Sequence, residues 1–355
     1  MEFGVLAFPR PQTVVDDVRA AEEYGFTHAW IPDSHMIYGD VYACMALAAA
    51  RTSKIKLGTG VAIASNRIPP VTVHSIATIN AIAPGRVLLG FGTGHTGRRV
   101  MGLPPVKLKD FEAEVKSIRE LLNKASTTYQ TEGLSRKIRY LHLDREFIKL
   151  EPAIPFYVAA SAPRTMQIAG EYGDGVITTG VVVPDRVAYL RKQVQRGAER
   201  GGRKLPKNFP IVALTQICVL RKGETLESLR VVDAMGHWVG AVLHAYAEGF
   251  GNAENLPEAI RPVYGAYTEY VANMKTPIEE RYLEIHEGHC AFLKPEERRF
   301  VTPELIKSLA IVGTRDECRE QIAALEREGV SQLFLNVAID GFRDYLKDIS
   351  EQLIQ

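Results

Sequence analysis

The sequence predicts an α/β fold, specifically a (β/α)8 TIM barrel with a mostly helical insertion before the last βα unit. Short apolar runs alternate along the chain with segments whose apolar residues recur at helical spacing. Eight strand-like runs occur, and parallel neighbours need helical crossovers of this kind. A length of 355 residues suits a barrel with insertions. An open doubly wound sheet is the alternative, and in both folds ligands bind at the carboxyl ends of the strands.

The predicted strands are short and apolar, and several are followed by glycine or proline. Pro32, for example, closes the second strand, because proline lacks the N–H that would continue the ladder. In chain order the predicted strands span residues 3–7, 27–31, 55–63, 86–90, 156–159, 175–178, 211–220 and 332–337.

The predicted helices carry recognisable terminal signals. Gly25 is a suitable C-cap for the first helix. Pro69 and Pro70 fit the first turn of the third, where a missing N–H costs nothing, and Gly85 ends that helix. In chain order the predicted helices span residues 13–24, 41–50, 69–85, 110–122, 164–172, 185–200, 315–328 and 342–353.

Two segments break the alternation of strands and helices. Residues from about 124 to 150 contain two β-like runs around Gly133, which predicts a hairpin or another excursion from the core. Residues from about 223 to 300 lack strand-like alternation and predict a mostly helical insertion. We therefore expect residues 1–355 to form a single barrel domain that carries these two insertions.

Composition and charge exclude several classes of protein. A formal net charge of +1 gives no electrostatic case for binding nucleic acid or an anionic membrane. The four cysteines lie far apart without a CxxC pair, so reduced cytoplasmic thiols are expected instead of disulfides or a zinc framework. The N-terminus lacks a signal-peptide pattern, and no apolar run of about 18 residues predicts a membrane span. A cytoplasmic protein is expected.

A glycine-rich turn follows the fourth predicted strand. Gly92, Gly94 and Gly97 match the G-x-G-x-x-G pattern of dinucleotide-binding proteins. The match lies late in the chain, however, and no acidic residue ends a strand about 20 residues further on, so we disfavour that function. The glycines instead predict the close approach of a flat or phosphorylated ligand to the backbone.

The other strand ends carry the same kinds of residue: glycines, small hydroxyls and exposed backbone amides. This inventory favours a large planar cofactor with a phosphate tail, and Ser161 stands just before a helix, where a phosphate oxygen binds well. The predicted cofactor-binding residues are Gly60, Val61, Asn66, Gly92, Thr93, Gly94, Ala160, Ser161, Ala162, Thr179 and Gly180.

Metal catalysis is poorly supported by the sequence, and no metal site is predicted. Asp33 and His35 lie two residues apart on a loop, without a second carboxylate–histidine pair to complement them. His286 and His289 form H-x-x-H, whereas metalloproteases need H-E-x-x-H. We interpret this pair as a surface feature of the insertion.

Several motifs together resemble those of the bacterial luciferase-like flavin oxidoreductases, most strongly the branch that contains methylenetetrahydromethanopterin reductase. The motifs are residues 30–35 (WIPDSH), 52–61 (TSKIKLGTGV), 67–72 (RIPPVT), 84–94 (PGRVLLGFGTG) and 173–176 (GDGV). The resemblance implies a (β/α)8 barrel, usually dimeric, with a non-covalent flavin or deazaflavin at the carboxyl ends of the strands. It also implies a non-prolyl cis peptide near Gly60 and Val61.

The same resemblance implies that the loop after the second strand supplies an acid or hydrogen-bond donor near the reactive edge of the cofactor. In this sequence that loop carries Asp33 and His35. Deazaflavin-dependent relatives often have histidine directly after the aspartate and a glutamate in the loop after the fourth strand. Here Ser34 intervenes, and the later loop carries His95. The predicted catalytic residues are therefore His35, Asp33 and His95.

The main hypothesis is an FMN-dependent monooxygenase that uses O2 and reduced FMN from a partner flavin reductase to oxygenate a small organic substrate. Histidine suits the proton transfers because its pKa lies near neutrality, and the sequence suggests no NAD(P)H site. The alternative is a hydride-transferring oxidoreductase that depends on coenzyme F420, a deazaflavin. A second alternative is a non-catalytic flavin-binding protein on the same barrel. A homodimer is expected from the resemblance.

Overall fold

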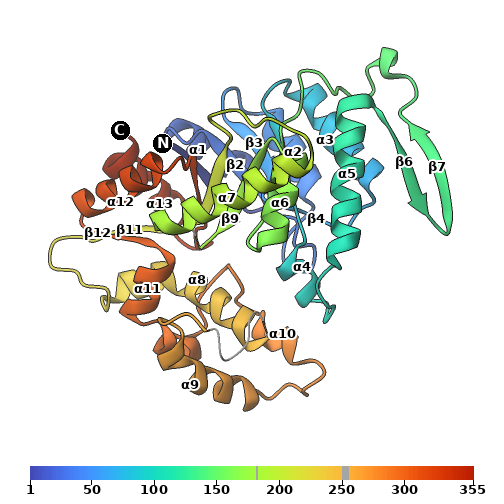
Figure 1. Cartoon of the computed structure of the whole chain (residues 1–355). Helices are drawn as coiled ribbons and strands as arrows, with labels where there is room; N and C mark the ends of the chain where they lie inside the picture. The colour runs from blue at the N-terminus through green and yellow to red at the C-terminus, as the bar shows by residue number, and fades with distance from the viewer. Residues whose placement is uncertain (181–182, 250–255) are drawn as a thin grey trace.

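Eight parallel strands close into a barrel in the computed structural model, which describes residues 1–180, 183–249 and 256–355 (Figure 1). The strands are β1 (Glu2–Leu6), β2 (His28–Ile31), β3 (Lys56–Thr59), β5 (Val87–Gly92), β8 (Phe156–Ala159), β9 (Gly175–Thr179), β10 (Ile211–Thr215) and β13 (Gln332–Leu335). They pair in the order β3-β2-β1-β13-β10-β9-β8-β5, and β5 pairs again with β3 to complete the ring. The predicted TIM barrel is confirmed, and an open sheet is excluded.

Helices follow most of these strands and cover the outside of the ring (Figure 1). They are α1 (Val14–Glu23), α2 (Val41–Ala49), α3 (Pro69–Ile82), α5 (Leu108–Lys124), α6 (Pro163–Tyr172), α7 (Pro184–Arg200) and α12 (Arg315–Arg327). The last helix, α13 (Phe342–Ile349), packs against α1 and continues into a π-helical turn, Ser350–Ile354. Within the described ranges, no helix is both long enough and apolar enough to cross a membrane.

The barrel interior is filled around one large side chain, Trp30. Its indole is fully buried and donates a hydrogen bond from Nε1 to Oε1 of Gln332 at 2.8 Å. Gly4, Gly58 and Gly60 lie against it, and a Cβ atom at Gly58 would come within 2.4 Å of the indole ring. These strands carry glycine at those positions because the tryptophan occupies the space.

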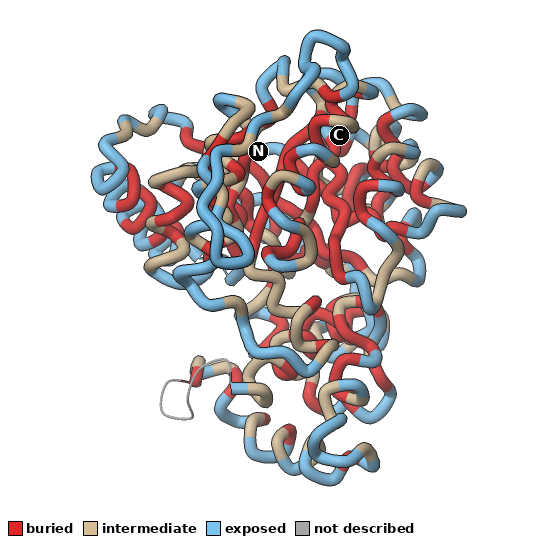
Figure 2. The backbone as a smooth tube through the Cα atoms, turned by 90° about the vertical axis from the view of Figure 1, so that its right-hand side faces the viewer, coloured by how far each residue is buried: buried red, intermediate tan, exposed pale blue. Residues whose placement is uncertain are grey.

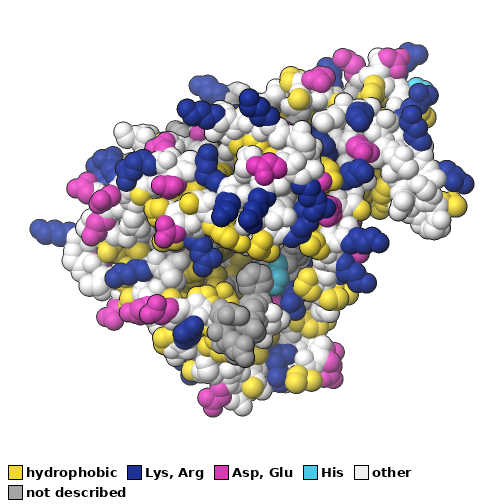
Figure 3. All heavy atoms as spheres, in the orientation of Figure 1, with side chains coloured by type: hydrophobic (Ala, Val, Ile, Leu, Met, Phe, Trp, Pro, Cys, Tyr) yellow, Lys and Arg dark blue, Asp and Glu magenta, His cyan; other side chains and the backbone are white. Residues whose placement is uncertain are grey.

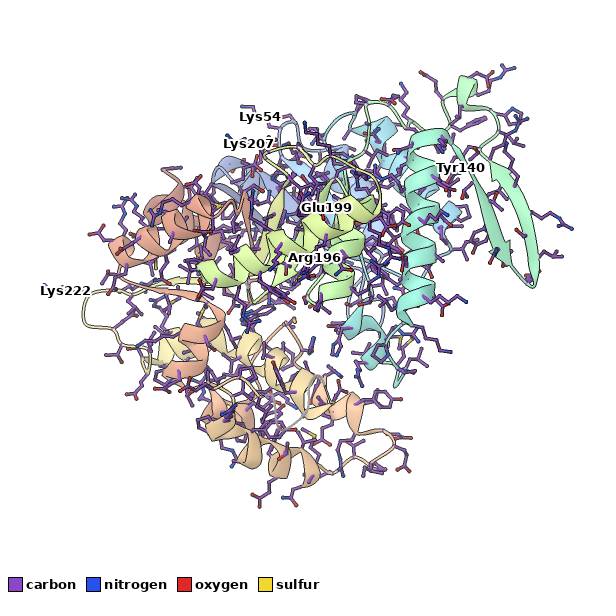
Figure 4. All side chains as sticks on the ribbon, in the orientation of Figure 1. Lys54, Tyr140, Arg196, Glu199, Lys207 and Lys222 are labelled. Atoms are coloured by element: carbon purple, nitrogen blue, oxygen red, sulfur yellow. The ribbon has the colours of Figure 1, made fainter. Side chains whose placement is uncertain are left out.

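The first predicted excursion is a β-hairpin beside the barrel. Strands β6 (Ser126–Thr131) and β7 (Leu134–Arg139) pair antiparallel and extend away from α5 (Figure 1). Tyr140, just after the hairpin, lies next to α5 (Figure 4) and donates a hydrogen bond from its hydroxyl to the carbonyl of Pro70 at 2.6 Å. This bond joins the hairpin to the start of α3.

The second excursion is the predicted helical insertion, which has a hydrophobic core of its own. It contains α8 (Leu229–Ala247), α9 (Arg261–Ala272), α10 (Arg281–Ile285), a 3-10 helix (Pro295–Phe300) and α11 (Pro303–Leu309). The chain enters it after β11 (Ile217–Val219) and returns at β12 (Ile311–Gly313), and these two strands pair in parallel. Figure 2 shows its buried residues as a second group below those of the barrel. Because β11 follows the carboxyl end of β10, the insertion lies at the carboxyl end of the barrel.

Three elements differ from the predictions. The strand expected at 55–63 is interrupted at a non-prolyl cis peptide, Gly60–Val61, after which β4 (Ala62–Ile63) pairs with β5. That cis peptide was itself predicted and is confirmed. The strand expected at 211–220 is divided at Gln216, where the chain leaves the ring. A short helix, α4 (His95–Arg99), directly follows β5 where only a turn was predicted.

Candidate active site

Asp33, at the carboxyl end of β2, is buried and engaged by several donors. Nη1 of Arg67 lies 2.8 and 2.9 Å from its two carboxylate oxygens, and the backbone N–H of Ile63 donates to Oδ2 at 3.2 Å. The Arg67 guanidinium also pairs with Asp40 and lies 4.8 Å from the centre of the Tyr42 ring. Asp33 therefore connects the loop after β2 to the bulge after β3, which is the segment 60–63 that contains the cis peptide. Its role as an acid stays a prediction.

Asn66 holds the second member of this loop, His35. Nδ2 of Asn66 donates to the backbone carbonyl of Asp33 and to Nδ1 of His35, both at 3.1 Å. An accepting Nδ1 leaves the proton of a neutral imidazole on Nε2. That nitrogen lies 3.2 Å from Sδ of Met101, and the His35 side chain is exposed. The loop therefore presents an imidazole N–H in a defined tautomer.

The glycines after β5 pack against the bulge after β3, and their role in binding a cofactor stays a prediction. Gly94 has a φ of 66°, and a Cβ there would lie 2.2 Å from Cγ2 of Ile63. A Cβ at Gly97 would lie 2.4 Å from Cδ1 of the same isoleucine. At Gly92 it would lie 2.9 Å from Cγ2 of Val61. Thr93, between Gly92 and Gly94 in the sequence, is half-buried.

The ends of β8 and β9 form an exposed polar corner. Oγ of Ser161 and Oγ1 of Thr179 lie 3.0 Å apart, and both residues are exposed. Ala160 is buried at the end of β8, and Ala162 is the N-cap of α6. Gly180 has a φ of 70°, and none of the described residues has an atom within 4 Å of the position that a Cβ would take. Two hydroxyls beside a helix N-terminus suit a phosphate group.

His95, the first residue of α4, is half-buried. Burial is the largest cause that lowers its pKa to about 4; Arg99 and His286 add to the effect, and Glu248 opposes it. The imidazole is therefore neutral near pH 7, able to donate one hydrogen bond and accept another. Glu248 and His286 both belong to the insertion, so α4 lies where the insertion meets the barrel.

Sequence reasoning missed Asn336, a buried amide that directly follows β13. Side chains alternate along a strand, so Asn336 continues the interior row of Gln332 and Phe334 towards the carboxyl end of the barrel. Neither polar atom of this amide has a hydrogen-bond partner among the described residues. Burying an unpaired amide is unfavourable, which makes this position a candidate contact for a polar ligand group. The sequence signal for this position was a single polar residue at the end of an otherwise apolar strand.

A second buried amide, Gln216, stands beside Asn336. The register pairs Leu214 with Phe334, so the residues two positions further along each strand are also neighbours. Nε2 of Gln216 lies 2.7 Å from Nε2 of His237 on α8. Burial lowers the pKa of His237 to about 4, so this imidazole is neutral and accepts the bond.

Three histidines of the insertion come together, and the interpretation of His286 and His289 as a surface feature is wrong. Both side chains are 4% exposed, and His244 on α8 is 1% exposed. One ring nitrogen of each lies within 4.8 Å of those of the other two. Burial is the largest cause that lowers the pKa of His244 and of His289. Nε2 of His289 lies 2.8 Å from Oγ1 of Thr96, so the group contacts α4.

The surface is hollowed between the barrel and the insertion. Figure 3 shows hydrophobic side chains around this hollow and a histidine within it. Two further cavities lie at the opposite, amino-terminal end of the strands. One, of about 890 Å³, is lined by Phe209 and Ser331, and another, of about 550 Å³, by Pro155 and Asp174. Neither adjoins the predicted site residues.

The polar groups lie at the carboxyl end of the barrel, where (β/α)8 enzymes have their active sites. The chain belongs to the luciferase-like monooxygenase family, whose model matches residues 1–332. It is 30% identical over 345 residues to a 5,10-methylenetetrahydromethanopterin reductase from Methanolobus tindarius, covering 94% of this chain and 93% of that protein. The predicted resemblance is confirmed, and the chain is an oxidoreductase.

Two other similar proteins concern coenzyme F420. An F420-dependent glucose-6-phosphate dehydrogenase from Nakamurella multipartita is 31% identical over 207 residues, covering 55% of this chain and 60% of that protein. The crystal structure of the coenzyme F420-dependent tetrahydromethanopterin reductase from Methanopyrus kandleri aligns with a TM-score of 0.74 and 21% identity, covering 99% of this chain and 98% of that one.

These names correct the main functional hypothesis. The expectation of an FMN-dependent monooxygenase is wrong, because the relatives found by sequence are named as a methylenetetrahydromethanopterin reductase and an F420-dependent glucose-6-phosphate dehydrogenase. The word monooxygenase stands in the name of the whole family, and two solved monooxygenases that align with 16–17% identity show a shared fold alone. A partner flavin reductase was required only by the FMN hypothesis.

Proposed function

We propose that the chain is a coenzyme F420-dependent oxidoreductase that transfers a hydride between this deazaflavin and a small organic substrate. The observation that carries the proposal is the likeness to a methylenetetrahydromethanopterin reductase over nearly the full length of both chains. The partial likeness to an F420-dependent dehydrogenase supports the same cofactor. When bound, F420 supplies the hydride acceptor or donor.

The residues at the carboxyl end of the barrel fit such a cofactor at two places. The hydroxyls of Ser161 and Thr179, beside the N-terminus of α6, suit its phosphate group. The amide of Asn336 is buried with both polar atoms unpaired among the described residues. An amide offers both a donor and an acceptor, which suits the polar edge of a deazaflavin ring.

Hydride transfer to or from a carbon atom also requires a proton at the neighbouring heteroatom of the substrate. Two imidazoles, those of His35 and His95, can move that proton. His35 carries its proton on Nε2 because Asn66 donates to Nδ1. His95 has a pKa lowered to about 4, so it is neutral near pH 7. Asp33 positions this loop through its pair with Arg67.

A binding titration tests the cofactor. We expect F420 to bind with micromolar affinity and FMN at least about tenfold more weakly, a difference of about 1.4 kcal/mol. Replacing both hydroxyls, Ser161→Ala with Thr179→Val, should weaken F420 binding. The matched control is Ser135→Ala, which removes an exposed hydroxyl from β7 in the hairpin and should change nothing. Tight FMN binding without F420 binding would overturn the proposal.

A turnover assay tests the reaction. The loss or gain of the visible absorbance of F420 is followed with methylenetetrahydromethanopterin, with glucose 6-phosphate and with a panel of simple alcohols and ketones. We expect at least one substrate to exchange hydride at the same rate with and without oxygen. A reaction that stops when oxygen is removed would contradict hydride transfer.

A further inference from the structure

The three buried histidines of the insertion are arranged with one nitrogen of each ring turned towards the other rings. Nδ1 of His289 lies 3.1 Å from Nδ1 of His244 and 3.1 Å from Nδ1 of His286. These residues come from α8 and from the segment that follows α10. The insertion therefore brings three Nδ1 atoms together in a site where each side chain is at most 4% exposed.

The outer nitrogen of each ring contacts an oxygen atom. Nε2 of His244 lies 3.1 Å from Oε1 of Glu297, and Nε2 of His286 lies 3.0 Å from Oε2 of Glu248. A carboxylate accepts but does not donate, so Nε2 of His244, which is hydrogen-bonded to Glu297, carries a proton. In a neutral imidazole the other nitrogen then has a lone pair, and in His244 it is directed towards His289. His286 turns its own Nδ1 towards the same ring.

A single proton on Nδ1 of His289 can serve only one of the two 3.1 Å contacts. A cation at the centre accepts a lone pair from all three nitrogens at once.

We propose that His244, His286 and His289 bind a divalent transition-metal ion, with Zn2+ as the best match. Neutral imidazole is a preferred ligand of zinc, and ligating histidines commonly donate their other N–H to a carboxylate. Glu297 and Glu248 stand in that supporting position.

The spacing of the nitrogens agrees with this metal. Zinc–nitrogen bonds of roughly 2.0–2.1 Å in a tetrahedron put the ligand nitrogens about 3.3 Å apart. The two Nδ1 separations of 3.1 Å approach that value. Three protein ligands leave the fourth position of a tetrahedral ion for water or a substrate atom, as in catalytic zinc sites. The contact of His289 with Thr96 places the metal site beside α4.

Metal binding is tested directly on the purified full chain, first stripped with a chelator. Calorimetric titration with Zn2+ should show one saturable site per chain, and Co2+ should give the intense visible absorption of a tetrahedral complex. Each of His244→Asn, His286→Asn and His289→Asn should weaken binding more than about 100-fold, because an amide is a poor zinc ligand. Glu248→Gln, which alters a supporting contact only, should weaken it by roughly 10- to 100-fold.

Two matched controls distinguish the loss of a metal-binding side chain from general destabilisation of the fold. His237→Asn changes another buried histidine of α8, and His74→Asn changes an exposed histidine of α3. Both should bind Zn2+ as the parent chain does, and circular dichroism should confirm that every variant is folded. Failure of the parent chain to bind Zn2+ stoichiometrically, or equal binding by His289→Asn and His74→Asn, would overturn the proposal. The titration contains no F420, so its outcome is independent of the proposed hydride transfer.

Discussion

Asp33 is an acidic residue that we expect to stabilise the fold through its contacts with neighbouring residues. Its side chain is 3% exposed and faces the Arg67 guanidinium at 2.8 Å. Removing one partner of a buried pair costs about 3–5 kcal/mol when the remaining charge has no other partner, and among the described residues Arg67 keeps only the exposed Asp40 as an ion-pair partner. We expect Asp33→Asn to lower the free energy of unfolding by about 3 kcal/mol, measured by urea denaturation.

The matched control for Asp33 is Asp40, the second partner of Arg67. Its side chain is 52% exposed, and its Oδ1 caps α2 by accepting from the N–H of Ala43. Asp40→Asn keeps a good N-cap and loses only an exposed ion pair, so the change should be below about 1 kcal/mol. Equal losses in both variants would show that the buried pair has no special role.

Buried histidines make the stability of the fold depend on pH. Burial lowers the pKa of His28 to about 3 and that of His237 to about 4. Between about pH 6.5 and 4 the unfolded chain binds protons that the folded chain does not, so the free energy of unfolding falls as the pH falls. Above about pH 7 these histidines add no pH dependence.

His237 offers the test of this pH dependence. A pKa lowered from 6.5 to about 4 corresponds to a contribution on the order of 3 kcal/mol across that interval. In His237→Gln the fall in unfolding free energy between pH 7 and pH 4 should be smaller by that order, measured by urea denaturation at several pH values. His74→Gln, at an exposed position, should leave the fall unchanged. A parallel pH profile in His237→Gln would contradict this explanation.

At the scale of elements, the turn from β5 into α4 depends on a close fit. A Cβ at Gly97 would lie 2.4 Å from Cδ1 of Ile63. Gly97→Ala should therefore destabilise the fold by about 1–3 kcal/mol through overpacking. Ile63→Val removes that Cδ1 atom and should alone cost about 0.5–1.5 kcal/mol.

The double variant, Gly97→Ala with Ile63→Val, tests this contact as a double-mutant cycle. Because the valine makes room for the new methyl group, the two losses should not add, and a coupling of at least about 0.5 kcal/mol is expected from thermal or urea unfolding. Strictly additive losses would show that the glycine is needed for some other reason. Gly94 is unsuitable for this cycle, because its φ of 66° strains any other residue.

Local patterns predicted the elements well where neighbouring residues decide the structure. The strand expected at 156–159 matches β8. The cis peptide at Gly60–Val61 was expected from the family resemblance alone. The glycines after β5 also make contacts that were not predicted. Ile63 fills the position of a Cβ at Gly94 and Gly97, and Val61 lies against that position at Gly92. A contact across two loops of this kind has no signature in spacing along the chain.

At the scale of the molecule, the site at the carboxyl end combines residues that are distant in sequence. His244 meets His289 and Glu297 only because the insertion folds back on α8. The sequence showed H-x-x-H, a pattern too weak to predict a buried cluster, and gave no sign of the third histidine. Asn336 and Gln216 likewise become neighbours only through the register of β13 and β10. The periodicity of a single segment does not show which distant segment it pairs with.

The last prediction concerns the outer surface of the molecule. The family resemblance implies a homodimer, and we expect a defined face to form its interface. Large exposed apolar side chains occur on and beside α2, α3 and the hairpin segment, which Tyr140 joins to α3. They are Met36, Leu47, Ile68, Val71, Ile82, Leu134, Leu141, Leu143 and Phe147. Exposed apolar side chains are typical of a subunit interface, so we expect this side of the barrel to form one.

Sedimentation velocity at micromolar concentration should therefore show a dimer. Val71→Glu combined with Phe147→Glu would bury two charges in that interface, and we expect the variant to sediment as a folded monomer because unpaired buried charges are strongly unfavourable. The matched control is Ile278→Glu, which adds a charge at a side chain that is 78% exposed in the insertion, away from α2 and α3, and should remain dimeric. A parent chain that sediments as a monomer, or a double variant that stays dimeric, would rule out this face as the interface.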